Sequence, residues 1–150
     1  MRGGSNHLTI EGGNMARKKK INYTYAVGRR RKASARIRLF KGKGDSTVNG
    51  KLIAEYFPGS VSRDAWSKPF KTVDVSNKYY VTVKVVGGGK KGQLDAVVHG
   101  IARALAKENK QEFRKPLKKL GFLTRDSRAR ERRKVGTGGK ARRKKQSPKR

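Results

Sequence analysis

The sequence contains no cysteine among its 150 residues. Disulfide bonds, thiolate nucleophiles and cysteine-ligated zinc are therefore excluded, which fits a reducing compartment. No apolar run reaches the roughly 18 residues that a membrane-spanning helix needs. Residues 1–14 lack the apolar core of a signal peptide.

Acidic and apolar residues are also scarce. Only 10 Asp and Glu oppose 41 Lys and Arg, which leaves a net charge of +31, and apolar residues make up 33% of the chain. We therefore expect only part of the chain to form a core. A charge this large repels itself, and a polyanion would relieve the repulsion, so nucleic acid is the expected partner.

The alternatives to nucleic acid have weaker support in the sequence. An anionic membrane surface would call for a basic amphipathic helix or a lipidation motif, and neither is present. His99 stands without cysteines or clustered carboxylates, so no metal site is predicted. No carboxylate pair or nucleophile–base arrangement is found either. We predict no enzyme activity, no catalytic residue, no cofactor and no small-molecule substrate.

Hydrophobic alternation predicts two clear strands. Over residues 34–40, Ala35, Ile37 and Leu39 share one face, and Arg36 and Arg38 make the other face cationic. Over residues 78–86, Tyr79 and alternate valines share a face. A short strand at 46–48 is followed by a turn at Asn49-Gly50.

Helical spacing predicts four further elements. Short helices are expected over 51–57 and 61–67, the second ending before Pro69. The clearest helix spans about 92–108, with an apolar stripe and an opposite polar stripe of Asp95, His99, Arg103 and Lys107. His99 is thus expected at a surface or RNA-facing position. A helix near 109–120 would end at Gly121, with Pro116 as a possible kink.

The segment "GGGKKG" at 87–92 lies between a predicted strand and a predicted helix. It matches the dinucleotide pattern GxGxxG, but Glu108 follows on a helix rather than at the end of a strand. Gln93-Leu94 also replace the Lys-Ser/Thr of a phosphate-binding P-loop. We expect the loop to pack on, or to cradle, a nucleic-acid backbone. A purely structural glycine turn is the alternative.

Basic residues dominate the end of the chain. Residues 125–150 hold 13 Lys and Arg and two acidic residues, a composition that cannot order itself and suits backbone neutralisation. No zinc-finger spacing, RNP aromatic pattern or helix-turn-helix stands out. The predicted divisions are 1–16 as a leader or flexible extension, 17–124 as a globular α/β RNA-binding body, and 125–150 as an extended basic tail.

Several segments together resemble the bacterial type of small-subunit ribosomal protein nine. They are "YAVGRRRKASARIRLFKGKG", "VNGKLIAEYF", "VTVKVVGGGKKGQLDAVVHGIARAL", "LKKLGFLTRDSRARERRKVG" and "KARRKKQSPKR", in this order, within residues 23–150. The resemblance implies an α+β two-layer sandwich, with a mainly antiparallel four-stranded sheet and helices packed on it. It further implies likeness to the second domain of small-subunit ribosomal protein five, and a long extended C-terminal tail.

The resemblance also implies a structural role in the ribosome, in the cytoplasm. Expected partners are small-subunit ribosomal RNA, the anticodon stem-loop of P-site tRNA and neighbouring proteins of the subunit head. Lys149 and Arg150 match the terminal pair expected to contact tRNA, although Ser147-Pro148 precede them where the family commonly has an aromatic residue and Ser. The other expected RNA-binding residues are Arg29, Arg30, Arg31, Lys32, Arg36, Arg38, Lys90, Lys91, Arg103, Arg125, Arg128, Arg130, Arg132, Arg133, Lys134, Lys140, Arg142, Arg143, Lys144 and Lys145.

A second hypothesis is a general nucleic-acid-binding protein or RNA chaperone. It shares the charge but predicts similar affinity for unrelated RNA and DNA, whereas the ribosomal hypothesis predicts residence in one subunit. An enzyme that holds ATP or a dinucleotide in the glycine loop is a third, and it would require saturable nucleotide binding.

Overall fold

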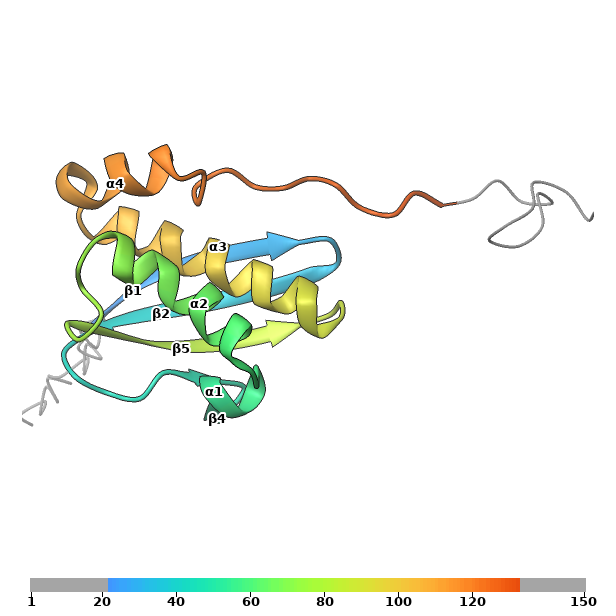
Figure 1. Ribbon diagram of the computed structural model, residues 1–150, viewed down its shortest axis with the longest axis horizontal. Helices are drawn as coiled ribbons and strands as arrows, with labels where there is room; N and C mark the ends of the chain where they lie inside the picture. The colour runs from blue at the N-terminus through green and yellow to red at the C-terminus, as the bar shows by residue number, and fades with distance from the viewer. Residues whose placement is uncertain (1–21, 133–150) are drawn as a thin grey trace, which may run out of the picture.

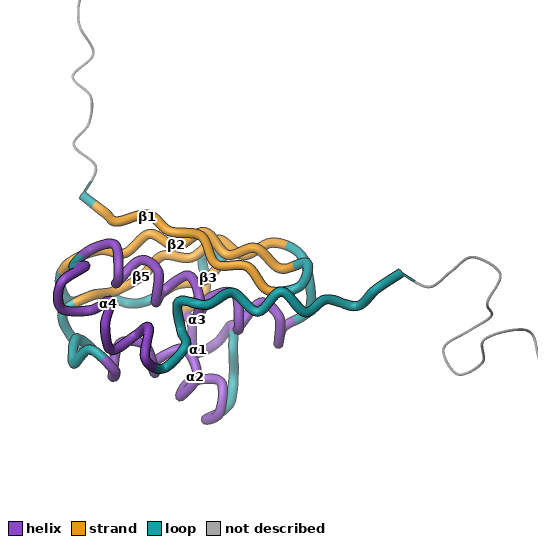
Figure 2. Tube along the Cα trace, turned by 90° about the horizontal axis from the view of Figure 1, so that it is seen from above, coloured by secondary structure: helices purple, strands orange, loops and turns teal. Residues whose placement is uncertain are grey.

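The computed structural model describes residues 22–132, which form a sheet covered by helices on one face (Figure 1 and Figure 2). The strands are β1 (Tyr23–Arg30), β2 (Ala33–Lys41), β3 (Thr47–Val48), β4 (Lys51–Leu52) and β5 (Tyr79–Val86). Their order in the sheet is β1-β2-β5-β3-β4, and only the β3–β5 pair is parallel. The mixed class and the mainly antiparallel sheet are confirmed.

The expected strand number is corrected from four to five. The short β4 pairs with β3 across the predicted Asn49-Gly50 turn, in a segment that helical spacing had assigned to a helix. The pattern of residues also did not predict β1. Its inward-facing residues include Ala26 and Gly28, which are too small to give a recognisable hydrophobic alternation.

The helices are α1 (Ile53–Tyr56), α2 (Ser60–Thr72), α3 (Lys90–Glu108) and α4 (Lys110–Lys119). The long α3 lies across β1 and β2, and α2 and α4 pack beside it (Figure 1). Within residues 22–132, no helix combines the length and the apolar character needed to cross a membrane.

Two of the helix predictions were wrong at their ends. The helix expected over 51–57 is reduced to the single turn of α1, because Lys51 and Leu52 pair with β3. The helix expected to stop before Pro69 continues to Thr72. Pro69 and Phe70 are buried, and the apolar contact they gain offsets the backbone hydrogen bond that proline cannot donate.

The predictions for the last two helices are confirmed, with small shifts at the ends. α3 begins two residues earlier than expected, at Lys90, and α4 spans 110–119 with Pro116 inside it. The Asn109 side chain caps α4 by accepting a hydrogen bond from the backbone N–H of Glu112. Gly121 follows α4 with a φ of +76°, as expected of a helix-ending glycine.

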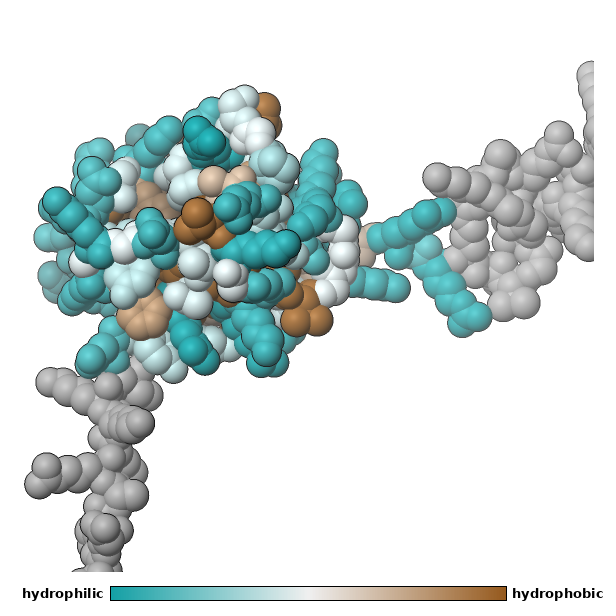
Figure 3. Space-filling view, turned by 90° about the horizontal axis from the view of Figure 1, so that it is seen from below, coloured by the Kyte–Doolittle hydropathy of each residue, from teal (hydrophilic) through white to brown (hydrophobic). Residues whose placement is uncertain are grey.

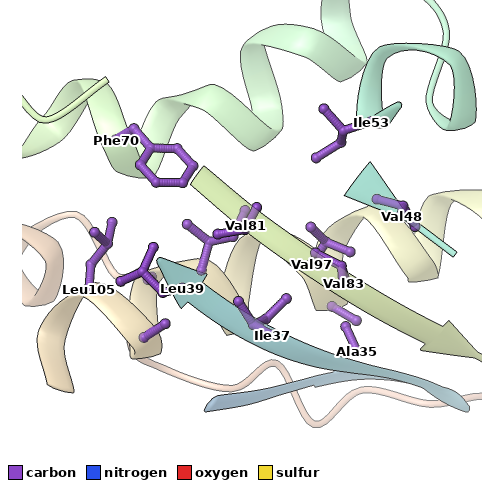
Figure 4. Close-up of a cluster of buried hydrophobic side chains, with 14 of the residues drawn as sticks. Ala35, Ile37, Leu39, Val48, Ile53, Phe70, Val81, Val83, Val97 and Leu105 are labelled. Atoms are coloured by element: carbon purple, nitrogen blue, oxygen red, sulfur yellow. The ribbon is translucent and has the colours of Figure 1, made fainter. Parts of the chain in front are cut away.

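The core lies between the sheet and the helices (Figure 4). The predicted alternation holds in both long strands, since Ala35, Ile37 and Leu39 of β2 are buried beside Val81 and Val83 of β5. From the helix layer, the fully buried residues Val97, Ile101 and Leu105 of α3 and Leu117 of α4 complete the core. Tyr23, Arg36, Arg38, Tyr80 and Lys84 alternate with inward-facing residues and so lie on the opposite face of the sheet.

Glycines allow α3 to approach β1 closely. A Cβ atom on Gly28 would lie 1.9 Å from the carbonyl oxygen of Ala96 and 2.4 Å from the backbone nitrogen of Gly100. A Cβ atom on Gly100 would in turn lie 2.5 Å from Cγ1 of Ile37. The two backbones thus pack directly against each other, and this contact sets the distance between strand and helix.

Candidate nucleic-acid interface

The residues that follow α4 return over the body and enclose a cationic hollow, which we call the tail-root hollow. It has a volume of about 1030 Å³ and lies between the end of β1, α2, α3 and residues 121–130. Figure 3 views the body from the side away from this hollow, where hydrophilic side chains are interspersed with apolar ones, and it shows hydrophilic side chains on the segment that leaves the body. The charged residues that line the hollow are Arg29, Arg30, Arg31, Lys68, Lys91, Arg128 and Arg130, opposed by Asp95 and Asp126.

Arg30 holds the start of the tail against the body. Its Nη2 atom lies 3.0 Å from Oδ2 of Asp126, its Nε atom lies 3.8 Å from Oδ2 of Asp95, and Nη1 donates to the carbonyl oxygen of Arg128. The Arg30 side chain is only 12% exposed. One guanidinium thus joins β1, α3 and the tail, and we call this group the Arg30 clasp.

Asp126 supplies the carboxylate that pairs with both Arg30 and Arg128 in the Arg30 clasp. Its carboxylate accepts hydrogen bonds from Nε and Nη2 of Arg128, the latter at 2.9 Å, and from the Arg128 backbone N–H at 3.0 Å. These bonds, with a smaller contribution from Arg30, hold the pKa of Asp126 well below its ordinary 3.8. The carboxylate therefore remains ionised at any pH near neutrality. Its contribution to stability declines as the pH falls below its ordinary pKa of 3.8 and is lost as the pH passes through the lowered pKa.

A second hollow of about 760 Å³ adjoins the glycine loop. Here three separate segments meet, namely the β1–β2 turn, residues 88–92 and residues 129–132. Six residues predicted from the sequence to bind RNA line it together: Arg31, Lys32, Lys90, Lys91, Arg130 and Arg132. The structure therefore joins cations that are about 100 positions apart in the sequence into one surface.

The glycine loop has a structural function on its inner side. Gly87 and Gly88 have φ values of +75° and +66°, and a Cβ on Gly87 would lie 2.6 Å from the carbonyl oxygen of Lys32. These two glycines are thus required for the loop to pack on the β1–β2 turn. A Cβ on Gly89 would meet nothing within 4 Å, so the outer side of the loop stays open beside the second hollow.

Lys90 is the first residue of α3, and its side chain is held against Tyr56. Its ammonium nitrogen lies 3.4 Å from the centre of the Tyr56 ring, a cation–π distance. The Tyr56 hydroxyl donates to Oε1 of Gln93 at 2.9 Å, and Nε2 of Gln93 donates to the carbonyl oxygen of Gly87 at 3.0 Å. This chain of contacts orients Lys90 and the glycine loop together.

The polar stripe of α3 lies along the free edge of β1. Arg103 donates to the carbonyl oxygen of Val27, Lys107 donates to that of Tyr25 at 3.3 Å, and Nδ1 of His99 accepts from the backbone N–H of Arg29 at 3.4 Å. These side chains form hydrogen bonds with backbone groups of β1. Without them, these groups of an edge strand would be free to pair with a strand of another molecule. Arg103, predicted to bind RNA, thus uses part of its guanidinium within the protein.

His99 is half-buried beside the tail root. Burial lowers the pKa of its imidazole below 6.5, and the charge of Arg103 lowers the pKa further. A lowered pKa in the folded state means that the unfolded chain binds the proton more tightly, so stability rises with pH through this range.

We therefore expect the free energy of unfolding to decrease as the pH falls below about 6.5, where the unfolded chain takes up the proton. Replacement His99→Gln should make this decrease smaller, because Gln does not titrate. Urea denaturation of both proteins at a series of pH values measures the difference. Identical pH dependence in the two proteins would show that another group is responsible.

The remaining predicted residues divide into three sets. Arg125 is an exposed residue of the segment after α4 and lines neither hollow. Arg36 and Arg38 lie on the outer face of the sheet, away from both hollows. The rest of the tail lies outside the described residues, and with it Arg133, Lys134, Lys140, Arg142, Arg143, Lys144, Lys145, Lys149 and Arg150, as does the proposed leader at 1–16.

Sequence reasoning missed three charged residues of the tail-root hollow. Lys68 of α2 was missed because the helix was expected to end before it, although Ala65 and Lys68 have the spacing of one helix face. Asp95 and Asp126 were missed because they are acidic residues in a basic surface. They act through Arg30, which lies 65 positions from Asp95 and 96 positions from Asp126 in the sequence.

These features define a class of protein, a small α+β body with a mainly cationic surface of the kind that suits a polyanion. A family model described as "Ribosomal protein S9/S16" matches residues 28–150. The chain therefore belongs to the ribosomal protein S9/S16 family, and it is a ribosomal protein and not an enzyme.

Curated relatives carry the name "Small ribosomal subunit protein uS9". One from Leifsonia xyli subsp. xyli is 47% identical over 111 residues, which cover 74% of this chain and 66% of the relative. One from Anaeromyxobacter sp. (strain K) is 47% identical over 79% of this chain and 91% of its own length. One from Thermus thermophilus is 48% identical over 75% of this chain and 87% of its own length.

Proposed function

We propose that this protein is a structural component of the small ribosomal subunit that binds ribosomal RNA through its body and its tail. The observation that carries the proposal is the meeting of the β1–β2 turn, the glycine loop and the tail root in one cationic surface. The names of the relatives support the choice of subunit. Neighbouring head proteins would be its other partners, in the cytoplasm.

The chemistry of this surface suits the sugar–phosphate backbone. An arginine guanidinium can donate two parallel hydrogen bonds to two phosphate oxygens, and a lysine ammonium group acts as a mobile point charge. The outer side of the glycine loop leaves the N-terminus of α3 open, and the partial positive charge there favours a phosphate beside Lys90 and Lys91. Such contacts position an RNA without reading its bases.

The tail would continue this RNA contact beyond the described residues. We propose that it runs through ribosomal RNA and ends on the anticodon stem-loop of P-site tRNA, where Lys149 and Arg150 would meet phosphates. The sequence matches the family model to its last residue, which supports this assignment. The proposal includes the expected likeness of the body to the second domain of small-subunit ribosomal protein five.

Sedimentation of the native protein in a sucrose gradient tests the proposal. The subunits are washed at roughly 0.5 M salt, which screens surface charges strongly. We expect the protein to remain in the small-subunit peak at one copy per subunit. A protein that leaves the subunit, or spreads over all RNA, would instead be a general nucleic-acid binder or RNA chaperone.

Removal of Lys149 and Arg150 is expected to weaken the binding of P-site tRNA by roughly 1–3 kcal/mol, because two charge-assisted contacts are lost. Filter binding of tRNA to purified small subunits that carry the shortened protein measures this loss. Replacement of Lys110 and Lys118 on α4 by Gln removes the same charge elsewhere and serves as the control. Unchanged tRNA affinity after the deletion would refute the terminal contact.

A further inference from the structure

The outer face of the sheet, which we call the open sheet face, is covered by no described helix (Figure 2). The register places Tyr25, Arg38 and Thr82 side by side across β1, β2 and β5, and places Arg36 beside Lys84 in the next row. Residues directly opposite each other in antiparallel strands share a face. Arg36, Arg38 and Lys84 therefore form a compact cationic group.

These three cations are free to meet a ligand. Each is exposed, and in the described part of the chain none of them forms an ion pair. The strands β1, β2 and β5 contain no Asp or Glu. The open sheet face therefore has unbalanced positive charge at its centre.

One aromatic ring on this face is also free. Tyr23, Phe40 and Tyr80 pack on each other, with the Phe40 and Tyr80 rings stacked at 5.1 Å and Arg38 over the Tyr23 ring. Tyr25 belongs to the next row and is 42% exposed, and among residues 22–132 no aromatic ring stacks on it. It offers an unoccupied flat surface beside the cations.

The free ring and the cations line one hollow of about 790 Å³. Its wall is completed by the Asn49-Gly50 turn, which connects β3 and β4. The Asn49 side chain fixes this turn to β5, since it accepts from the backbone N–H of Val85 at 2.9 Å and donates to the carbonyl oxygen of Val85 at 3.1 Å. The hollow is therefore formed before any ligand binds.

We propose that the open sheet face binds a single-stranded segment of RNA. Arg36, Arg38 and Lys84 hold its phosphates, and a base stacks on the Tyr25 ring. This inference rests on the proposed function and adds to it a second RNA contact, on the face opposite the tail root. Because bases inside a duplex are already stacked, only an unpaired base can use the ring.

Charge complementarity selects this occupant over the others. The terminal segments of the chain are themselves basic, with Lys and Arg at 17–20 and through 133–150, and would be repelled by the cations. A second copy carries the same net charge of +31. An acidic protein could match the charges, but an exposed ring beside a group of cations is the arrangement that binds bases and phosphates together.

The first test uses the full chain with two short oligonucleotides of equal length, one of uridines and one abasic. Both oligonucleotides bind through their phosphates, but only the uridine strand has bases. The ratio of their two affinities therefore measures the contribution of base stacking. We expect Tyr25→Leu to reduce the preference for the uridine strand by roughly tenfold, and Tyr25→Phe to retain it. Val86→Ala, which alters an exposed apolar residue of the same face, is the matched control. An unchanged ratio in Tyr25→Leu would overturn the stacking.

The phosphate contacts are tested by the salt dependence of the same binding. Arg36→Gln and Lys84→Gln should each lower the slope of log affinity against log salt by about one unit for both oligonucleotides. Slopes equal to that of the unaltered protein would overturn the phosphate contacts.

Ultraviolet crosslinking of assembled small subunits, followed by mass spectrometry, tests the occupant directly. We expect a nucleotide attached to the peptide that contains Tyr25, whereas attachment to another protein would overturn the proposal. This outcome is separate from the proposed function. A protein that remains in the small-subunit peak but lacks the Tyr25 crosslink would refute only the open-sheet-face contact.

Discussion

Replacement of Gly28 by alanine is expected to destabilise the body by about 3 kcal/mol or more, which is the upper end of the range for overpacked cores. The added Cβ would lie 1.9 Å from the carbonyl oxygen of Ala96. The atoms it meets belong to the backbone of α3, so no side chain can rotate away. Relief requires α3 to move off the sheet, which opens the core around Ile37 and Ile101.

Urea denaturation followed by circular dichroism measures this loss. Gly92→Ala is the matched control, because its Cβ would be at least 3.8 Å from the nearest atoms and the residue lies within α3. That change should be neutral or stabilise by up to about 1 kcal/mol, since alanine is the better helix former. Equal stability of Gly28→Ala and the unaltered protein would show that the helix does not lie this close to β1.

Disruption of the Arg30 clasp is expected to release the start of the tail while the body stays folded. In Asp126→Asn, Arg30 and Arg128 lose their shared carboxylate and repel each other. The backbone amides of Phe122, Thr124 and Arg128, which are hydrogen-bonded at the tail root, should then exchange with deuterium roughly tenfold faster or more. Hydrogen exchange measured by mass spectrometry at neutral pH detects this.

The structure provides a control and a cross-check for the clasp. Asp64→Asn removes an exposed carboxylate whose partner Lys71 lies on the same helix, and it should leave exchange at the tail root unchanged. Arg30→Gln should reproduce the effect of Asp126→Asn, and the double variant should add little to either, because both break the same interaction. Additive effects, or unaltered exchange in Asp126→Asn, would contradict a clasp centred on Arg30 and Asp126.

The clasp also matters for the proposed function. If the tail binds RNA at its far end, the direction in which it leaves the body decides what it can reach. A tail root held before binding loses less conformational entropy when RNA is met than one that must be ordered at that moment. Arg30 is therefore a positioning residue for the tail, in addition to lining the cationic hollow.

Part of this structure could be predicted from local patterns. The alternation of Ile37 and Leu39 with arginines predicted β2 and its buried face, and the apolar stripe of 92–108 predicted α3 nearly to its ends. These predictions succeeded because each element buries one regular face, and the period of that face is visible in the sequence. β1 escaped prediction because Ala26 and Gly28 give it no such face.

The positions of the elements relative to one another explain the other differences. α2 continues through Pro69 because the free energy gained by burying this residue in the core outweighs the cost of proline within a helix. Intrinsic helix propensities do not include this tertiary contribution. The polar stripe of α3 was expected at a surface or facing RNA, yet it binds the backbone of β1. Its role depends on α3 lying against β1 at the distance that Gly28 and Gly100 permit.

The sequence by itself determined the chemistry of this protein. Charge and composition pointed to a polyanionic partner, and a set of ordered motifs pointed to the family, because these properties do not depend on how the chain is folded. Only the tertiary structure decided which cations act together. It joined Arg31, Lys91 and Arg130 into one surface, tied the tail to Arg30 through Asp126, and set Tyr25 among Arg36, Arg38 and Lys84 on the opposite face. Contacts between distant residues arise from the packing of helices on a sheet, and for this reason they cannot be predicted from local sequence periodicity.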